Sequence, residues 1–252
     1  MRHTGTHRHI SARCWSAIAL GALSACGGGD GGIDQQAEKA LCFDSSVFAV
    51  GAKLNIDYVE SGFATGARTE TSVVLSDIAT FNGSPNLVER RITTSGTSVR
   101  GETNYRVESN LSKYEKPLGP GVTGLYGTVA NGRFGQQRIV LYNPPYEDRR
   151  GELKRGQEGV FTSQGIDTTT GTVPAGPTSF TRQIRIKFVG VDSLSLPAGQ
   201  YAACRYDIRT DDGAFSSEWI YRGVVVRQER TTGTPDPEIL EMKTGTLNGA
   251  LL

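Results

Sequence analysis

Apolar and polar residues alternate with a period of two over much of the chain, between short segments rich in Gly, Pro, Asn and Asp. In one such segment Ile184, Ile186 and Phe188 fall on one face, while Arg185 and Lys187 fall on the other. This alternation is typical of a β-strand with one buried face and one face in water. It therefore predicts an amphipathic strand at this place in the chain.

Several other segments repeat the pattern, and the links between them are short. They include Leu54, Ile56 and Tyr58; Tyr105 and Val107; the more continuous apolar run 138–142; and residues 201–209, where Ala202, Cys204, Tyr206 and Ile208 share a face. Short links without helix-length segments favour antiparallel pairing. We therefore predict a mainly β chain that forms an antiparallel, curved half-barrel or a sandwich-like body, with one short helix over residues 35–41.

An internal similarity suggests that the body contains two related β units. Residues 81–94 align with residues 197–210 at an offset of 116, which places Gly83 opposite Gly199. Self-similarity at a fixed offset is the signature of a structural repeat. A chance match between β-rich segments with regular turns is the alternative.

The proposed join between the two units contains Pro144 and Pro145 within a charged segment. Paired prolines interrupt strand pairing, and charges favour contact with water. We therefore predict a first β unit over residues 42–142, a connector over residues 143–156 and a second β unit over residues 157–252.

The first 25 residues have the composition of an export signal. Arg2, Arg8 and Arg13 precede a mostly apolar run over residues 15–25, and no acidic residue occurs in this leader. A basic segment, a short apolar segment and small residues at the cleavage point are the parts of a secretory signal peptide. No apolar run reaches the roughly 18 residues that a membrane-spanning helix needs.

The end of this leader, Leu23-Ser24-Ala25-Cys26, resembles the lipobox of bacterial lipoproteins. The resemblance implies cleavage before Cys26, acylation of that cysteine, and a lipidated, glycine-rich tether over residues 26–41. It also implies the outer membrane, because Gly27 stands where an Asp favours retention in the inner membrane. Several acyl chains anchor a protein far more firmly than one. An ordinary signal peptide with an incidental Cys26 is the alternative.

Removal of the leader changes which chemistry is available. All three histidines, His3, His7 and His9, lie within it, and the loss of three arginines changes the formal charge from +1 to −2. A histidine-free chain cannot assemble a Ser-His-Asp triad or a histidine metal site. We therefore predict no catalytic, cofactor or metal site and a non-enzymatic protein.

Acidic pairs are the remaining candidates for catalysis. They are Asp57 with Glu60, Glu147 with Asp148, and Asp211 with Asp212, with Glu102 as a further acid. Most lie near predicted turns, where acids commonly serve as turn formers and solvated charges. Opposite charges nearly cancel along the chain, which gives no footprint for nucleic acid.

Two cysteines, Cys42 and Cys204, remain once Cys14 is removed with the leader and Cys26 is acylated. Two thiols in an exported, oxidising compartment most often pair. We therefore predict a disulfide between them, closing a loop of about 160 residues. Two separate buried thiols are the alternative.

Residues 195–208 and 217–227 resemble a pattern of uncharacterised bacterial lipoproteins, in which a Pro-Ala-Gly turn enters a strand and a Trp-containing strand pair follows. Those proteins look related to the antiparallel half-barrels of the Lol lipoprotein-carrier type. The resemblance implies the fold more than the activity. Within it, Trp219 and Tyr206 are either core aromatics or residues that face a ligand, and the core interpretation explains them without a ligand.

These observations favour a non-enzymatic, membrane-anchored lipoprotein of the bacterial cell envelope that binds a hydrophobic or lipidic ligand in a concave β surface. A structural or protein-interaction module of an envelope complex is the first alternative. A hydrolase that works through acids such as Asp57 or Glu102 is a weaker one. The expected partners are the membrane, a lipidic ligand or an envelope protein, and no cofactor is expected.

Overall fold

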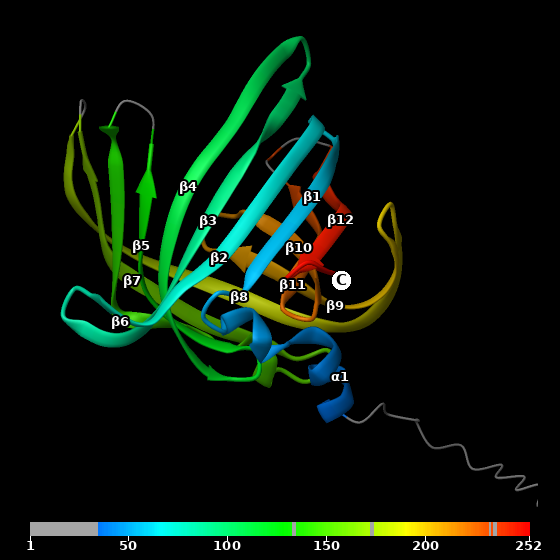
Figure 1. The fold of residues 1–252 in the computed structure, drawn as a ribbon, viewed down its shortest axis with the longest axis horizontal. Coiled ribbons are helices and arrows are strands. Elements are labelled where there is room, and N and C mark those ends of the chain that lie inside the picture. Colours follow the sequence, from blue (N-terminus) through cyan, green and yellow to red (C-terminus); the bar gives the residue numbers. More distant parts are fainter. Residues whose placement is uncertain (1–34, 133–134, 172–173, 232, 234–235) are drawn as a thin grey trace, which may run out of the picture. The chain divides into compact units, whose positions relative to one another are not determined.

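The computed structural model describes residues 35–132, 135–171, 174–231, 233 and 236–252. They carry one antiparallel sheet of 13 strands, in which each strand pairs with the next along the chain. Strand β1 also pairs with β12, so the first twelve strands close into a barrel (Figure 1). The predicted mainly β, antiparallel class is confirmed, but the predicted open half-barrel or sandwich is wrong because the sheet closes on itself.

The first half of the chain supplies α1 and six strands. Their bounds are α1 (Gln35–Cys42), β1 (Lys53–Gly62), β2 (Thr65–Phe81), β3 (Ser84–Arg100), β4 (Thr103–Gly119), β5 (Val122–Asn131) and β6 (Gln137–Asp148). The second half supplies β7 (Glu158–Thr170), β8 (Ala175–Leu196), β9 (Gly199–Thr210), β10 (Phe215–Tyr221), β11 (Val224–Thr231), β12 (Glu238–Leu247) and β13 (Ala250–Leu251). In the links that the structure describes lie the 3-10 helices η1 (Ser45–Phe48) and η3 (Arg150–Glu152).

Strands β1 and β12 close the barrel, and the inward-facing residues of one strand lie opposite inward-facing residues of the other. Tyr58 lies opposite Met242 and Glu60 lies opposite Leu240. All four residues are buried. Because directly paired residues of antiparallel strands share one face, these side chains all point into the barrel. Closure thus buries the inner faces of β1 and β12 together.

One row of paired residues shows which positions of the next strands face inward. Ile56 pairs with Glu70, Glu70 with Thr94, and Thr94 with Ser109, across strands β1 to β4. Since Ile56 is buried in the core, the whole row lies on the inner face. Polar side chains therefore occupy inner positions on β2, β3 and β4.

The apolar core gathers around the C-terminal strands. Two clusters lie there: one contains Ile56, Tyr58, Leu194, Leu196, Ala203, Trp219, Val224, Val226, Leu240 and Met242, and the other contains Cys42, Leu153, Ile186, Phe188, Cys204, Tyr206 and Ile220. A third, smaller cluster of Ala52, Val74 and Val88 lies near the start of β1 and on β2 and β3. A barrel of eight strands has room only for its own side chains or one small ligand, and barrels widen as strands are added. Twelve strands therefore leave interior space that these clusters do not fill.

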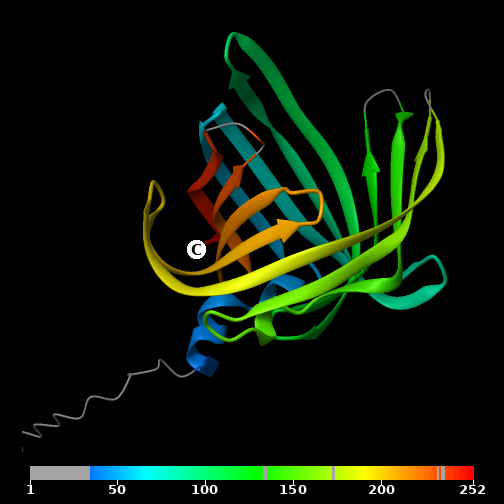
Figure 2. The same ribbon diagram turned by 180° about the vertical axis from the view of Figure 1, so that it is seen from behind.

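Helix α1 forms, as predicted, and packs at one end of the barrel (Figure 2). The backbone N–H of Arg222 donates to the carbonyl of Leu41 at 2.8 Å, and that of Gly223 donates to Cys42 at 2.6 Å. These bonds join the helix end to the β10–β11 turn. Residues 35–41, which the sequence assigns to the tether, thus belong to the folded body, while Cys26 and the rest of the tether lie outside the described residues.

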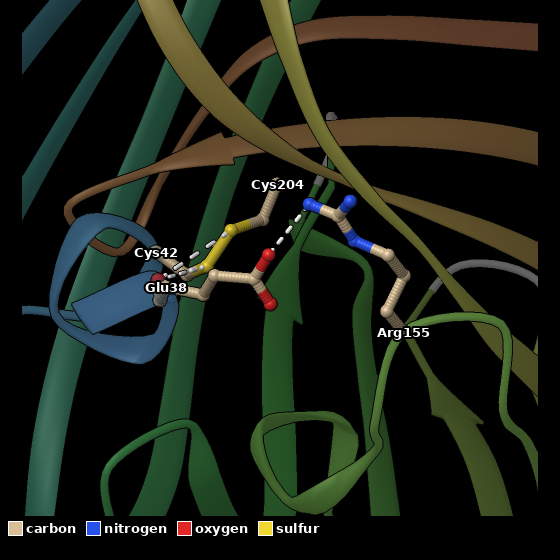
Figure 3. Close-up of a disulfide and its surroundings, with 4 residues drawn as sticks. All are labelled: Glu38, Cys42, Arg155 and Cys204. Atoms are coloured by element: carbon tan, nitrogen blue, oxygen red, sulfur yellow. Dashed lines mark hydrogen bonds and ion pairs between the residues drawn. A yellow bond between two sulfur atoms is a disulfide. The ribbon is translucent and has the colours of Figure 1, made fainter. Parts of the chain in front are cut away.

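The predicted disulfide between Cys42 and Cys204 is present, with a Cα–Cα distance of 5.6 Å (Figure 3). It joins α1 to β9 instead of crossing the core between two strands. Beside it, the buried carboxylate of Glu38 accepts a hydrogen bond from Arg155 at 2.6 Å. The helix is therefore held to the barrel by a disulfide and an ion pair in addition to the two backbone hydrogen bonds at its end.

The predicted connector is partly strand. Pro144 and Pro145 lie within β6, whose pairing with β7 ends at Tyr142 and whose pairing with β5 resumes at Tyr146. The prolines thus interrupt pairing, as a missing backbone N–H requires, without ending the strand. The two similar segments lie largely in β3 and β9, six strands apart, and the duplication stays a prediction.

We expect the double variant Cys42→Ala/Cys204→Ala to lower the free energy of unfolding by roughly 2–4 kcal/mol, because the bridge constrains a long loop of the unfolded chain. Urea titration of the segment 33–252, which forms one compact unit, measures the change. A reductant should shift the native protein to the same midpoint and leave the double variant unaffected. Equal stability of the two proteins without reductant would contradict the expectation.

Candidate functional site

The barrel contains a cavity of about 830 Å³. Strands β1 to β6, β10 to β12 and η3 supply its walls, and residues 43–48, which come directly after α1, line it as well. Ligand sites in proteins typically have volumes of roughly 300–1,000 Å³. The cavity is therefore large enough for a small molecule or a lipid-sized ligand.

One wall of the cavity is apolar. It is made by Leu54 and Ile56 of β1, Ile220 of β10, Val224 and Val225 of β11, and Leu240 of β12. The hydroxyl of Tyr58, on the same side, donates to the carbonyl of Val225 at 2.8 Å. Burial raises the pKa of this hydroxyl, so Tyr58 stays neutral. Glu218 of β10 and Gln228 and Arg230 of β11 also line the cavity on this side, so the wall is mostly, but not wholly, hydrocarbon.

The adjoining wall, which begins at the strand paired with β1, is polar, apart from Ile92 and Leu111. It is made by Arg68, Glu70 and Ser72 of β2, Arg90 and Thr94 of β3, and Ser109, Lys113 and Glu115 of β4. We call this set the polar wall and the preceding set the apolar wall. The cavity is thus amphipathic across its width.

Most charged groups around the cavity are paired. In the polar wall, the Nε of Arg90 donates to Glu115 at 2.7 Å, and the Arg90 guanidinium lies 4.5 Å from the ring centroid of Phe48. Arg68 contacts Glu60 and lies 2.9 Å from Glu238. Buried charges are tolerated only when they are paired, and each of these charges has a partner of opposite sign. Glu60 Oε2, Arg68 Nε and Arg90 Nη2 are buried without a hydrogen-bond partner among the described residues.

A second charged cluster lies at the β6 side of the cavity. Arg150 of η3 lies 2.7 Å from Asp148 and 2.8 Å from Glu218, and its guanidinium carbon lies 5.7 Å from the ring centroid of Tyr206. The amide of Gln228 donates to the other oxygen of Glu218 at 2.9 Å. This network joins η3 to strands β10 and β11.

Three charged side chains that line the cavity have no such partner. Glu70, Lys113 and Arg230 form no ion pair or side-chain hydrogen bond within the part of the chain that the structure describes. Burial raises the pKa of the Glu70 carboxyl, while the positive charges of Lys113 and Arg90 act in the opposite direction. A desolvated carboxyl in a cavity is a common feature of functional sites.

The aromatic residues predicted from the sequence lie in the core instead of lining the cavity. Trp219 is 5% exposed, its indole N–H donates to Asp192 at 2.9 Å, and the guanidinium groups of Arg205 and Arg227 lie over its ring. Tyr206 is 2% exposed and stacks on Phe188. The core interpretation accounts for both residues.

The acids considered for catalysis do not converge in the cavity. Asp57 faces outward and accepts hydrogen bonds from Thr69 and Thr244 at 2.7 Å. Glu102 is exposed in the β3–β4 turn, and Asp211 and Asp212 lie in the β9–β10 turn. Two other named acids, Glu60 and Asp148, are held in the ion pairs with Arg68 and Arg150.

The sequence pattern does not reveal Glu70, Arg90 and Lys113 as residues of the cavity. Polar residues stand on both faces of β2 near Glu70, as in Thr69, Glu70, Thr71 and Ser72, so alternation gives no sign of which face is inside. The sequence does show that Ile56 shares an inward face with Leu54 and Tyr58. To infer from this that Glu70 also faces inward, one must know that Glu70 pairs with Ile56, and the sequence does not give this register.

Metal clusters and membrane-spanning helices are both absent from the described part of the chain. Among those residues, no group of three or more His, Cys, Asp or Glu side chains is placed to hold a metal ion. Within the same ranges, no helix has both the length and the apolar character needed to cross a bilayer.

We expect Glu70→Gln to raise the thermal midpoint of unfolding at pH 7 and to have little effect at pH 4. Burial raises the pKa of Glu70 above its unfolded value of about 4.3. The folded state therefore keeps this proton to higher pH than the unfolded chain. Stability is lost as the pH rises from the unfolded pKa through the folded pKa, and the loss is complete above the folded pKa. Calorimetry at the two pH values tests the difference.

Asp57→Asn serves as the control with the opposite sign. Hydrogen bonds from Thr69 and Thr244 lower the pKa of Asp57, so its ionised form contributes stability at pH 7 that is lost as the pH falls through the folded pKa. The variant should be slightly less stable at pH 7. A gain for Glu70→Gln of equal size at both pH values would show that ionisation is not its cause.

Comparisons with known proteins assign no family to the chain. No protein-family model matches it, and no curated protein matches it. Among solved structures, it is similar to a candidate exported protein of Bacteroides fragilis with a YmcC-like fold, at 10% identity and a TM-score of 0.33, over 82% of this chain and 99% of that one. A likeness at this level carries no function to the chain, so the function has to be inferred from the cavity and the residues that line it.

Proposed function

We propose that the chain is a non-enzymatic, lipid-anchored protein of the bacterial cell envelope that binds an amphipathic lipidic ligand inside its barrel. The observation that carries the proposal is the cavity with a mostly apolar wall that adjoins a polar wall. Its volume of about 830 Å³ suits a ligand of lipid size.

The two walls favour an amphipathic ligand over a purely apolar or purely polar one. A hydrocarbon alone would strip water from Glu70 and Lys113 without replacing the lost hydrogen bonds, which is costly. A purely polar ligand would leave Leu54, Ile56 and Leu240 without an apolar partner and would forgo about 25 cal/mol per Å² of covered area. A molecule with both parts satisfies both walls.

Closure of the barrel changes the expected position of the ligand. The open sheet predicted from the sequence offered a concave face, whereas the closed barrel offers an interior. A ligand inside the barrel is bordered by strands β1 to β6 and β10 to β12 and, in part, by residues of the segment 43–48. Binding would therefore protect an acyl chain more completely than an open half-barrel would.

The envelope location is supported by the leader and by cysteine chemistry. The Leu23-Ser24-Ala25-Cys26 segment resembles a lipobox, which implies a lipid anchor and favours the outer membrane. The disulfide between Cys42 and Cys204 is of the kind that persists in oxidising compartments such as the periplasm. Both observations suit an envelope protein.

A structural or protein-interaction module is the second candidate. The β2–β3 hairpin exposes Leu75 at 40% and Ile78 at 75%, and exposed apolar residues can mark interaction sites. Against this candidate, the pairing of β1 with β12 removes the free strand edges to which a partner could add a strand of its own. The hydrolase alternative has no support from the positions of Asp57 and Glu102.

We expect the segment 33–252 to bind a dansyl-labelled undecanoic acid, with increased probe fluorescence as it leaves water. Thr94→Trp, on the cavity side of β3, should weaken binding by about tenfold or more because the indole fills the cavity. Thr93→Trp, one residue away on the exposed side, should bind like the native protein. If the native protein and both variants all fail to bind the probe, the interaction module becomes the leading candidate.

The anchor can be tested separately in the full chain. We expect Cys26→Ser to abolish labelling by radioactive palmitate and to prevent lipid anchoring, because no thiol remains at the lipobox position. Cys14→Ser changes the other leader cysteine and should leave labelling intact. Labelling that survives in Cys26→Ser would show that the lipobox interpretation is wrong.

A further inference from the structure

The polar wall contains two opposite charges that the protein leaves unmatched. Glu70 on β2 and Lys113 on β4 both point into the cavity, and β3 lies between their strands. No ion pair joins them to each other or to another described residue, although the Lys113 charge acts on Glu70. Their neighbours Arg68, Arg90 and Glu115 are all engaged in ion pairs.

Within the polar wall, Glu70 and Lys113 are the charged groups that lack a partner among the described residues, while Arg230 is unmatched on β11. Charged groups that lose water inside a protein need a partner of opposite sign, and the cavity otherwise provides one in nearly every case. Glu70 pairs with Thr94 of β3 and Lys113 pairs with Arg90 of β3, so the two charges share the inner face but lie two strands apart and four residues out of register. Each can therefore take a matching charge from one ligand that lies along this wall. A head group with its own cation and anion has that pattern.

We propose that the polar wall binds the zwitterionic head group of an amphiphile, with Lys113 holding its anionic part and Glu70 its ammonium. This inference rests on the proposed function and names the class of ligand that the cavity takes. A phosphoethanolamine head group has the required phosphate and ammonium.

The neighbouring residues give the ligand its direction. Glu70 is the direct pairing partner of Ile56, which belongs to the apolar wall beside Leu54. An acyl chain attached to a head group at Glu70 therefore reaches hydrocarbon within one strand spacing, about 4.8 Å. The chain would lie along Leu54, Ile56 and Leu240, and the head group would stay on β2 and β4.

Three lipids with the same acyl chain test the inference by displacing the dansyl probe from the segment 33–252. They are lysophosphatidylethanolamine, which is zwitterionic; lysophosphatidylglycerol, which is anionic; and a monoacylglycerol, which is neutral. A buried charge-assisted hydrogen bond changes affinity by about tenfold. We therefore expect the zwitterionic lipid to bind about tenfold more tightly than the anionic lipid, and the neutral lipid to bind most weakly.

Variants of the two residues should separate the two contacts. Glu70→Gln should weaken the zwitterionic lipid by about tenfold and remove its advantage over the anionic lipid. Lys113→Met should weaken both phosphate-containing lipids about equally and leave the neutral lipid unchanged. Glu89→Gln and Arg91→Met change the same kinds of charge on the outer face of β3 and should have no effect.

Arg230→Met provides a stricter control, because Arg230 lines the cavity on β11 and also lacks a partner among the described residues. If it weakens the phosphate lipids as much as Lys113→Met does, the cavity responds to net charge and the assignment falls. The assignment also falls if Glu70→Gln has no effect or if the three lipids bind equally. In those cases the proposed function stands, whereas failure of every lipid and of the probe to bind would overturn the proposed function itself.

Discussion

The pairing of β1 with β12 is the interaction on which the rest of the structure depends. It matches Tyr58 with Met242 and Glu60 with Leu240, and it joins the two ends of a twelve-stranded meander. Without it, both strands would present unpaired N–H and C=O groups at a sheet edge, and Met242 would face water. With it, the inward positions of all twelve strands share one interior, and a cavity exists.

Closure also explains why so many charges can lie inside. Arg68 on β2 reaches Glu238 on β12 across β1, because closure of the barrel places β12 on the other side of β1 from β2. The lower dielectric of an enclosed interior strengthens such pairs and raises the cost of a charge left alone. The lack of a partner for Glu70 and Lys113 therefore costs more free energy inside the barrel than it would on an open sheet, where water would solvate both charges.

The local structure could be predicted from the sequence because its causes are local. Alternation identified the strands around Ile184 and Ile56, and two thiols left in an exported chain identified the bond between Cys42 and Cys204. Closure could not be predicted in this way, because it depends on pairing between residues as far apart as Leu54 and Leu247. Apolar alternation looks the same in an open and in a closed sheet. The cavity could not be predicted for a different reason. Along β2 and β3, neighbouring residues such as Thr93 and Thr94 place polar groups on both faces of the strand. Only the pairing with an apolar residue on the next strand shows which of the two faces lies inside the barrel.

The order of synthesis gives the seam between β1 and β12 a consequence for the timing of folding. β1 is among the first strands to emerge and must wait for β12, which comes nearly 200 residues later. Cys204 emerges before β12, so oxidation with Cys42 can fasten α1 to β9 while the sheet is still open. Long-range pairing is slow, and unpaired strand edges invite association between chains. The period between the appearance of β1 and that of β12 is therefore the interval in which this chain most needs protection from its own copies.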